Sequence, residues 1–284
     1  MSATPSLGAG DLVLCAGTLA ATPLEERIPA VAAAGFRGMS LFLDDLEGAR
    51  ARGHSDADLR ARLADHGLSI AELDPLMTWA PGAQPGESGF LRWQEPDFYA
   101  AAAAVGARSI NAVAFGVDSV ERDAAVEAFG ALCDRAAAHD LLVHLEFMPF
   151  GPIPDLATAL DIVEGAGCAN GGVMYDVWHH LRGGGTLEAL REAAPRILGV
   201  QLDDAPAAAE SNLVDETLHR RLLPGAGDAQ VAQAIRALEA GGCQAPLGVE
   251  VFSDELATLS PLEIAQRAAD ATRQVIAEAR GGQA

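Results

Sequence analysis

Four short apolar segments in the second half of the chain end in side chains that can ligate a metal ion. They read Val143-His144-Leu145-Glu146, Val173-Met174-Tyr175-Asp176, Leu198-Gly199-Val200-Gln201 and Leu247-Gly248-Val249-Glu250. If these segments are parallel strands of a barrel, their C-terminal ends converge on one face. Carboxylates gathered there repel one another unless a cation lies among them. The set Glu146, Asp176, Gln201 and Glu250 therefore predicts a divalent-metal site.

The types of these side chains also bear on the ion. A single acid at a strand end is more often a salt-bridged or solvated carboxylate, and each one taken alone could be that. Two glutamates, an aspartate and a glutamine at four strand ends favour a metal site instead. The set is all oxygen and contains no cysteine, which favours Mn²⁺ or Mg²⁺ and leaves Co²⁺ or Zn²⁺ as alternatives.

Asp176 opens the string Asp176-Val177-Trp178-His179-His180-Leu181-Arg182, which carries further candidates. His179 follows the predicted ligand by three residues, one turn beyond the metal, so we expect its imidazole to hydrogen-bond a substrate oxygen. Trp178 is either a wall of the substrate pocket or packing between barrel and helix. His180 points elsewhere in a helix or an extended turn and is expected to be structural.

Other polar residues lie near the expected strand ends. His144 precedes Glu146 by two residues, so on a strand both side chains share the inward face. His144 is then either a partner of the metal ligands and substrate or a buried histidine, and the sequence does not decide. Glu72, Asp74 and Asn111 are weaker candidates for contacts with the substrate.

Arg221 lies in a segment that could bind an anion. Arginines precede the turn Gly225-Ala226-Gly227, which leads into a predicted helix. A glycine-rich turn at a helix N-terminus can hold an anion, and an arginine can clamp a phosphate, a carboxylate or a pair of hydroxyls. We therefore expect Arg221 to contact substrate. Two long connections, 79–96 and 203–228, are expected to cover the substrate.

Short apolar runs alternate with amphipathic stretches along the whole chain. Strands are predicted at 12–16, 38–42, 69–73, 109–115, 142–147, 173–176, 198–202 and 247–251. Helices are predicted at 23–34, 56–66, 124–139, 155–166, 186–194 and 228–240, several of them with a capping residue before and a glycine after. This pattern predicts an α/β protein, a single (β/α)₈ TIM barrel domain over residues 1–284. A doubly wound open sheet is the alternative, but no GxGxxG follows the first strand.

The composition excludes several classes of function. The chain has 40 acidic and 19 basic residues and a formal net charge of −21, which disfavours nucleic acid as a partner. All 19 basic residues are arginine, so Schiff-base chemistry, a pyridoxal-phosphate lysine and a Walker A lysine are excluded.

The cysteines and the apolar runs bear on the cellular location. The cysteines at 15, 133, 168 and 243 form no CxxC pair, which fits reduced thiols in a cytoplasmic protein. Residues 1–10 are not expected to form a signal peptide, and no apolar run approaches the ~20 residues of a membrane span. A homodimer is compatible with the sequence.

Five strings, taken in order, resemble the sugar phosphate isomerase/epimerase family of xylose-isomerase-like barrels. They are His144-Leu145-Glu146-Phe147, Asp176-Val177-Trp178-His179, Gln201-Leu202-Asp203-Asp204, Arg221-Leu222-Leu223-Pro224-Gly225 and Val249-Glu250-Val251. That family includes ketose 3-epimerases, hydroxypyruvate isomerase, inosose dehydratase and endonuclease IV. The resemblance implies that Glu146, Asp176, Gln201 and Glu250 hold the metal and that His179 touches substrate.

The chain also departs from its resemblance in two respects. Epimerases of the family usually have histidine where Gln201 stands, and an amide oxygen is a weaker donor that favours a harder metal. Endonuclease IV relatives need a histidine-rich cluster of three metals, whereas this chain has seven histidines in all and a strongly negative charge. A role in DNA repair is therefore not expected.

The function expected from the resemblance is that of a metal-dependent isomerase or epimerase acting on a sugar or related polyhydroxy carbonyl compound. Glu146 and Glu250 would flank the substrate, one removing a proton beside the carbonyl and the other returning it through an enediolate. The first alternative is a dehydratase or lyase that eliminates a β-leaving group from a keto-sugar or keto-cyclitol at the same site. The second is a non-catalytic barrel that binds a sugar.

Overall fold

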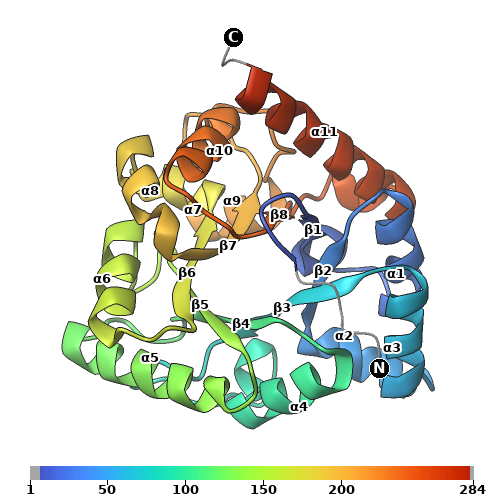
Figure 1. Ribbon diagram of the computed structural model, residues 1–284, viewed down its shortest axis with the longest axis horizontal. Helices are drawn as coiled ribbons and strands as arrows, with labels where there is room; N and C mark the ends of the chain where they lie inside the picture. Colours follow the sequence, from blue (N-terminus) through green and yellow to red (C-terminus); the bar gives the residue numbers. More distant parts are fainter. Residues whose placement is uncertain (1–6, 282–284) are drawn as a thin grey trace.

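Eight parallel strands close into a barrel in the computed structural model, which describes residues 7–281 (Figure 1). The strands are β1 (Leu12–Leu14), β2 (Gly38–Phe42), β3 (Ser69–Leu76), β4 (Ser109–Val113), β5 (Leu142–Glu146), β6 (Gly171–Asp176), β7 (Ile197–Leu202) and β8 (Leu247–Val249). Each strand pairs with the next one in the chain, and β8 pairs with β1. The predicted TIM barrel is thus confirmed, and the open-sheet alternative is wrong.

Helices surround the barrel (Figure 1). They are α1 (Leu24–Ala33), α2 (Leu43–Ala51), α3 (Asp56–Asp65), α4 (Glu95–Val105), α5 (Arg122–Ala137), α6 (Leu156–Ala166), α7 (Val177–Arg182), α8 (Leu187–Ala193), α9 (Leu213–His219), α10 (Val231–Ala240) and α11 (Pro261–Gly281), with short 3₁₀ turns η1 (Ala16–Leu19), η2 (Phe90–Arg92), η3 (Ala194–Arg196) and η4 (Leu256–Thr258). None of the helices within residues 7–281 is long and apolar enough to cross a membrane. The expectation of no signal peptide falls mostly on residues 1–6, which lie outside the described residues.

The ends of these elements follow the chemistry of the sequence. Ser55 caps α3 by accepting a hydrogen bond from the backbone of Asp58, and Asp155 caps α6 in the same way from Thr158. Gly167 ends α6 with a φ of 64°, a left-handed conformation that favours glycine. The predicted strands and helices agree with the structure to within three residues at either end.

The strands read as nearly continuous apolar runs because both of their faces are buried. Helices cover the outer face, and side chains fill the interior of the barrel, so β6 is buried along its whole length. Glycines make room where the interior is crowded. A Cβ at Gly199 of β7 would lie 2.7 Å from His144 Nδ1, so the absence of a side chain there accommodates the imidazole.

Two long connections lie at the C-terminal end of the barrel. Residues 79–96 contain η2, and residues 203–228 contain α9. The carboxylate of Asp204 holds the second connection together, because it accepts hydrogen bonds from the backbone amides of Ala205, Gly225 and Ala229. Both connections contribute side chains to one cavity, as their predicted place beside the site requires.

Candidate functional site

A cavity of about 250 Å³ opens among the C-terminal ends of the strands. The polar side chains that line it are Asp74, Glu146, His179, Thr217, Arg221 and Glu250. They come from the ends of β3, β5 and β8, from α7 and from the connection that contains α9. This is the face on which barrel enzymes of this architecture carry their active sites.

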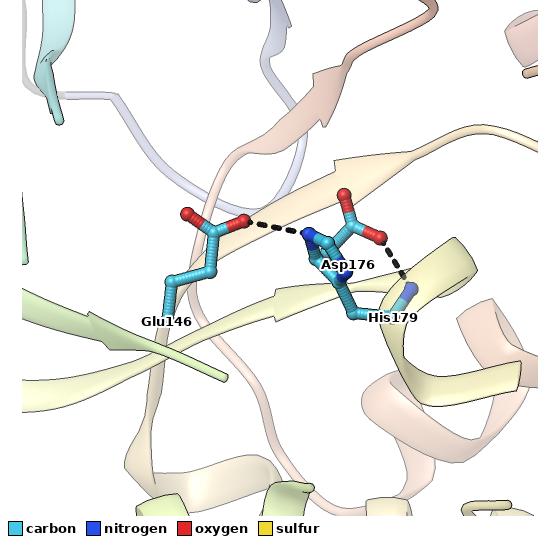
Figure 2. A group of neighbouring side chains, drawn as sticks. All are labelled: Glu146, Asp176 and His179. Atoms are coloured by element: carbon cyan, nitrogen blue, oxygen red, sulfur yellow. Dashed lines mark hydrogen bonds and ion pairs between the residues drawn. The ribbon is translucent and has the colours of Figure 1, made fainter. Parts of the chain in front are cut away.

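Glu146, Asp176 and His179 form a close group of possible metal ligands on this face (Figure 2). Glu146 ends β5 and Asp176 ends β6, while His179 lies in the first turn of α7. Glu146 Oε1 lies 3.3 Å from His179 Nε2, and Asp176 Oδ1 accepts a 2.8 Å hydrogen bond from the backbone N–H of His179. One ligand atom from each residue lies within 4.8 Å of the others, so the group could hold a metal ion.

Gln201 and Glu250, the other two predicted ligands, lie next to this group. Gln201 pairs in register with Asp176 across β6 and β7, and its side chain is buried. Neither its amide nitrogen nor its amide oxygen has a hydrogen-bond partner among the described residues. Glu250 directly follows β8 and lines the cavity. A buried amide without a partner costs free energy, so the amide oxygen of Gln201 is available to a metal ion or a substrate, and its role as a ligand stays a prediction.

Arg221 is buried between two aspartates. Its Nη1 atom lies 2.7 Å from Asp176 Oδ2 and 2.7 Å from Asp203 Oδ2, and its Nε and Nη2 atoms donate to Thr217. Burial would raise the pKa of Asp176, but the charge of Arg221, helped by His179, holds that pKa below its ordinary value. Burial and the neighbouring charge of Asp176 raise the pKa of Asp203 well above its usual range. The arginine therefore orients a predicted ligand, and its predicted contact with substrate stays a prediction.

Removal of this guanidinium should destabilise the protein strongly. We expect Arg221→Met to lower the free energy of unfolding by about 3–5 kcal/mol, because two buried carboxylates lose their cation. Denaturant unfolding measures the change. The matched control is Arg220→Met at the neighbouring, exposed arginine, which pairs with Glu210 and Asp215 at the surface and should change stability far less. Equal losses at the two positions would contradict this account.

Asp74, a weaker candidate for substrate contact in the sequence, contributes a further carboxylate to the cavity lining. Strand β3 continues to Leu76, which carries Asp74 into the cavity lining. Asn111 Nδ2 joins it to the site, donating to Asp74 Oδ1 at 2.7 Å and to Glu146 Oε2 at 2.5 Å. Burial, and then the nearby charges of Glu146 and Glu72, raise the pKa of Asp74 well above its usual range. The ionised form of Asp74 is therefore disfavoured here, and a cation at the site would offset that rise.

Glu250 experiences the same crowding of charge. Burial raises the pKa of its carboxyl well above the ordinary range, Arg221 opposes that rise, and Asp74 and Glu146 add to it. The raised pKa favours the protonated form of this carboxyl, and a cation nearby would favour its ionised form instead.

Trp178 and His144 are not among the described residues that line the cavity. Trp178 is fully buried, and its indole Nε1 donates to Glu216 at 3.0 Å. It packs edge-on against His179 with ring centroids 5.3 Å apart, which corresponds to the packing alternative. His144 is fully buried in β5, and neither of its ring nitrogens has a hydrogen-bond partner in the part of the chain that the structure describes. Burial, helped by the charge of Arg108, lowers its pKa to about 3, which corresponds to the buried-histidine alternative.

His180, expected to be structural, is buried with its Nε2 3.3 Å from the carbonyl oxygen of Thr186.

Glu72 lies in β3 but does not line the cavity. Its carboxylate is buried and accepts a weak hydrogen bond from Cys15 Sγ at 3.7 Å. Burial raises its pKa from 4.5 to about 7, although the charge of Arg108 opposes the rise. Glu72 is thus protonated in the folded protein at a pH where the unfolded chain has already released that proton.

This difference makes stability depend on pH. Below the unfolded pKa of 4.5, Glu72 is protonated in both the folded and the unfolded state and does not reduce the free energy of unfolding. That free energy falls as the pH rises from 4.5 towards about 7. Glutamine resembles the protonated carboxyl, so Glu72→Gln should stabilise the protein by up to about 3 kcal/mol near pH 8 and far less near pH 5. Denaturant unfolding at both pH values tests this, with Glu188→Gln on the exposed surface as control. A gain independent of pH would contradict the assignment.

The sequence interpretation missed the apolar wall of the cavity. Five phenylalanines line it, namely Phe42, Phe90, Phe115, Phe150 and Phe252, together with Met77 and Met148. Most of these residues end a strand or follow one within a few residues, so the strand predictions already placed them on the active face. The position of these apolar residues at or just after the strand ends is the signal that could have identified the wall.

The sequence matches the family described as xylose isomerase-like TIM barrel over residues 28–275. A 3-dehydroshikimate dehydratase of Pseudomonas aeruginosa is 28% identical over 246 residues, which make up 81% of this chain and 36% of that protein. Inosose isomerase of Bacillus velezensis is 27% identical over 160 residues, 55% of this chain and 56% of that protein. The chain thus matches about a third and about half, respectively, of the length of these relatives.

The structure agrees with the sequence match. The IOLI protein, solved with a binding zinc atom, resembles the chain with a TM-score of 0.84 at 20% identity, over 94% of this chain and 98% of that one. At this identity the likeness concerns the fold. The family match covers most of the chain. The closed barrel of the chain carries acidic residues at the ends of its strands. The chain belongs to the xylose isomerase-like TIM barrel family.

Proposed function

We propose that the chain is a divalent-metal-dependent enzyme that moves a proton at a carbon next to a carbonyl in a small polyhydroxylated compound. The observation that carries this proposal is the unpartnered, buried amide of Gln201 beside the close group of Glu146, Asp176 and His179. The relatives named above are an isomerase and a dehydratase, which supports an enzymatic role.

The residues present fit a divalent ion. Glu146, Asp176, Gln201 and Glu250 would hold it, with Mn²⁺ or Mg²⁺ favoured by the all-oxygen set. His179 Nε2 lies close enough to the group to enter the coordination itself, and a nitrogen ligand would shift the preference towards zinc or cobalt. A bound ion would polarise the carbonyl of the substrate and offset negative charge that develops on its oxygens.

The proton chemistry falls to the two glutamates. Glu146 ends β5 and Glu250 follows β8, so they enter the cavity from strands that are not neighbours. A substrate between them would present one face of the reacting carbon to each carboxylate. One glutamate would remove the proton, and the other would return it on the opposite face or at the adjacent carbon. The product would be an epimer or an isomer.

A dehydratase or lyase is the second candidate, and the 3-dehydroshikimate dehydratase relative favours it. Its first step is the same removal of a proton beside the carbonyl. The electron pair then expels a hydroxyl or alkoxyl group from the β-carbon, so that water or an alcohol leaves. A keto-sugar or keto-cyclitol with such a leaving group would undergo this reaction.

Turnover in D₂O tests the proposal. Solvent deuterium should enter the carbon next to the carbonyl in recovered substrate or product, as measured by mass spectrometry across open-chain and cyclic polyhydroxy ketones. The product of isomerisation has the mass of the substrate plus any deuterium taken up. The product of elimination is lighter by one molecule of water or alcohol. A buried glutamate could return the same proton, so substrate deuterated at that carbon is the second arm. Complete retention of that label with its migration would contradict proton exchange and indicate a hydride shift.

A further inference from the structure

The outer wall of the cavity is apolar, although its floor carries the charged group. Phe42, Phe90, Phe115, Phe150 and Phe252 line it, so five of the nine phenylalanines of the chain lie around this one cavity. A site for a free sugar needs donors and acceptors for each hydroxyl group. Here such groups are confined to the floor, at Asp74, Glu146, His179, Arg221 and Glu250, apart from Thr217. The phenylalanine side chains of the wall offer no hydrogen-bond donor or acceptor to a hydroxyl group.

Exposed apolar side chains gather at the same mouth. Phe115, Val214 and Leu218 are 39%, 40% and 47% exposed, and the fourth exposed large hydrophobic residue within residues 7–281 is Leu262. The first three all line the cavity, although they come from the loop after β4 and from α9. Val214 and Leu218 are four residues apart and so lie on one face of α9. Such a gathering of exposed apolar groups marks a binding surface.

Within residues 7–281, the lining of the mouth also offers no free positive charge. Arg221 is the only arginine that lines the cavity within the described part of the chain, and there is no lysine. Its guanidinium already donates to Asp176, Asp203 and Thr217. A phosphate or carboxylate on the substrate would therefore lie near Asp74 and Glu250 without a side-chain cation to pair with it. The charge of the lining thus selects against an anionic substituent.

From the apolar wall, the exposed mouth and the absence of a free cation, we propose that the substrate is amphipathic. Its hydroxy-carbonyl head reaches the group of Glu146, Asp176 and His179, and an uncharged apolar group of about the size of one ring contacts the phenylalanines and Leu218. The cavity of about 250 Å³ leaves room for a head and a ring but not for a long chain. The inference rests on the proposed function, because it places the head at the proposed metal site.

Three hydroxymethyl ketones that share one head test the proposal: 2-hydroxyacetophenone, dihydroxyacetone and dihydroxyacetone phosphate. Calorimetric titration of Mn²⁺-loaded protein should show that the phenyl compound binds at least about tenfold more tightly than dihydroxyacetone, because its ring is removed from water. The phosphate should bind most weakly. Equal or tighter binding of dihydroxyacetone or its phosphate would overturn the proposal.

Variants locate the binding of the ring. Leu218→Gln should lower the affinity for the phenyl compound by about five- to tenfold and leave the affinity for dihydroxyacetone unchanged. Leu262→Gln is the matched control, since it alters an exposed leucine outside the cavity, and it should change neither affinity. If Leu218→Gln instead shifts the oligomeric state in size-exclusion chromatography and leaves the preference for phenyl intact, the mouth is an interface between copies and the proposal is wrong.

A separate measurement keeps the two proposals apart. Exchange of the hydroxymethyl hydrogens of 2-hydroxyacetophenone in D₂O reports proton transfer, whereas the titrations report the apolar subsite. A preference for phenyl that depends on Leu218, with no exchange, supports the subsite and counts against the proposed chemistry. Exchange without that preference supports the chemistry and overturns the subsite.

Discussion

Replacement of Glu250 by glutamine should lower turnover by about 10²–10⁴-fold, and Glu146→Gln should do the same. Both side chains line the cavity from strands that are not neighbours, as a proton donor and acceptor on two faces of a substrate would. Glutamine keeps the shape of the side chain but can neither remove nor return a proton. The loss should appear mainly in kcat, measured under saturating substrate and with the metal content of each variant determined.

Glu72→Gln is the matched control for these two variants. It makes the same chemical change at a buried glutamate of the barrel that does not line the cavity. Its turnover should stay within a few-fold of the unaltered protein, even though its stability changes with pH as described above. Comparable losses in all three variants would show that Glu146 and Glu250 are not the acid and base, and that charge in the barrel matters only for structure.

Removal of the divalent ion should abolish turnover, and Mn²⁺ or Mg²⁺ should restore it best. Elemental analysis should find close to one ion per chain, since one group of ligands forms the site. Binding to the folded state alone should also raise stability, by about 2.7 kcal/mol when the free ion is at a hundred times its dissociation constant. Thermal unfolding with and without the ion measures this without reference to activity. Full activity in metal-free protein would contradict the proposed site.

Gln201→Leu separates a ligand from a structural glutamine. It removes the buried amide that has no partner within residues 7–281, so the variant should lose most of the thermal shift on adding Mn²⁺. The variant should not be strongly destabilised without metal, because no hydrogen bond within the protein is broken. Gln244→Leu changes an exposed glutamine far from the group and should keep the full shift. A normal shift in Gln201→Leu would remove this residue from the ligand set.

Local chemistry was enough to predict the barrel. Eight apolar runs separated by amphipathic stretches allow few other folds, because parallel strands need helical crossovers and must be buried on both faces. Capping residues such as Ser55 and Asp155 placed helix starts to within a few residues. The same topology brings strand ends together, which is why Glu146, Asp176 and Gln201 could be grouped from their positions in the sequence.

Only the tertiary structure decided what each of these groups contacts. His179 joins Glu146 and Asp176 because α7 begins directly after its capping residue, Asp176. The first turn of this helix places the imidazole of His179 next to Glu146. Arg221 is sequestered by Asp176 and Asp203, which lie 45 and 18 residues away in the sequence. Pairings over such separations depend on how loops fold, and loops carry no periodic signal.

Some features of the cavity follow from the sequence, and others depend on the tertiary structure. The sequence by itself determined a TIM barrel with a negatively charged, oxygen-rich floor, because strand order places those acids on one face whatever the loops do. It did not determine the apolar mouth, since Phe90, Val214 and Leu218 come from the two long connections, whose fold the strand pattern does not specify. Each alone would pass for an ordinary core residue. Their convergence is a property of three-dimensional packing, and the substrate group expected to bind there follows from that packing.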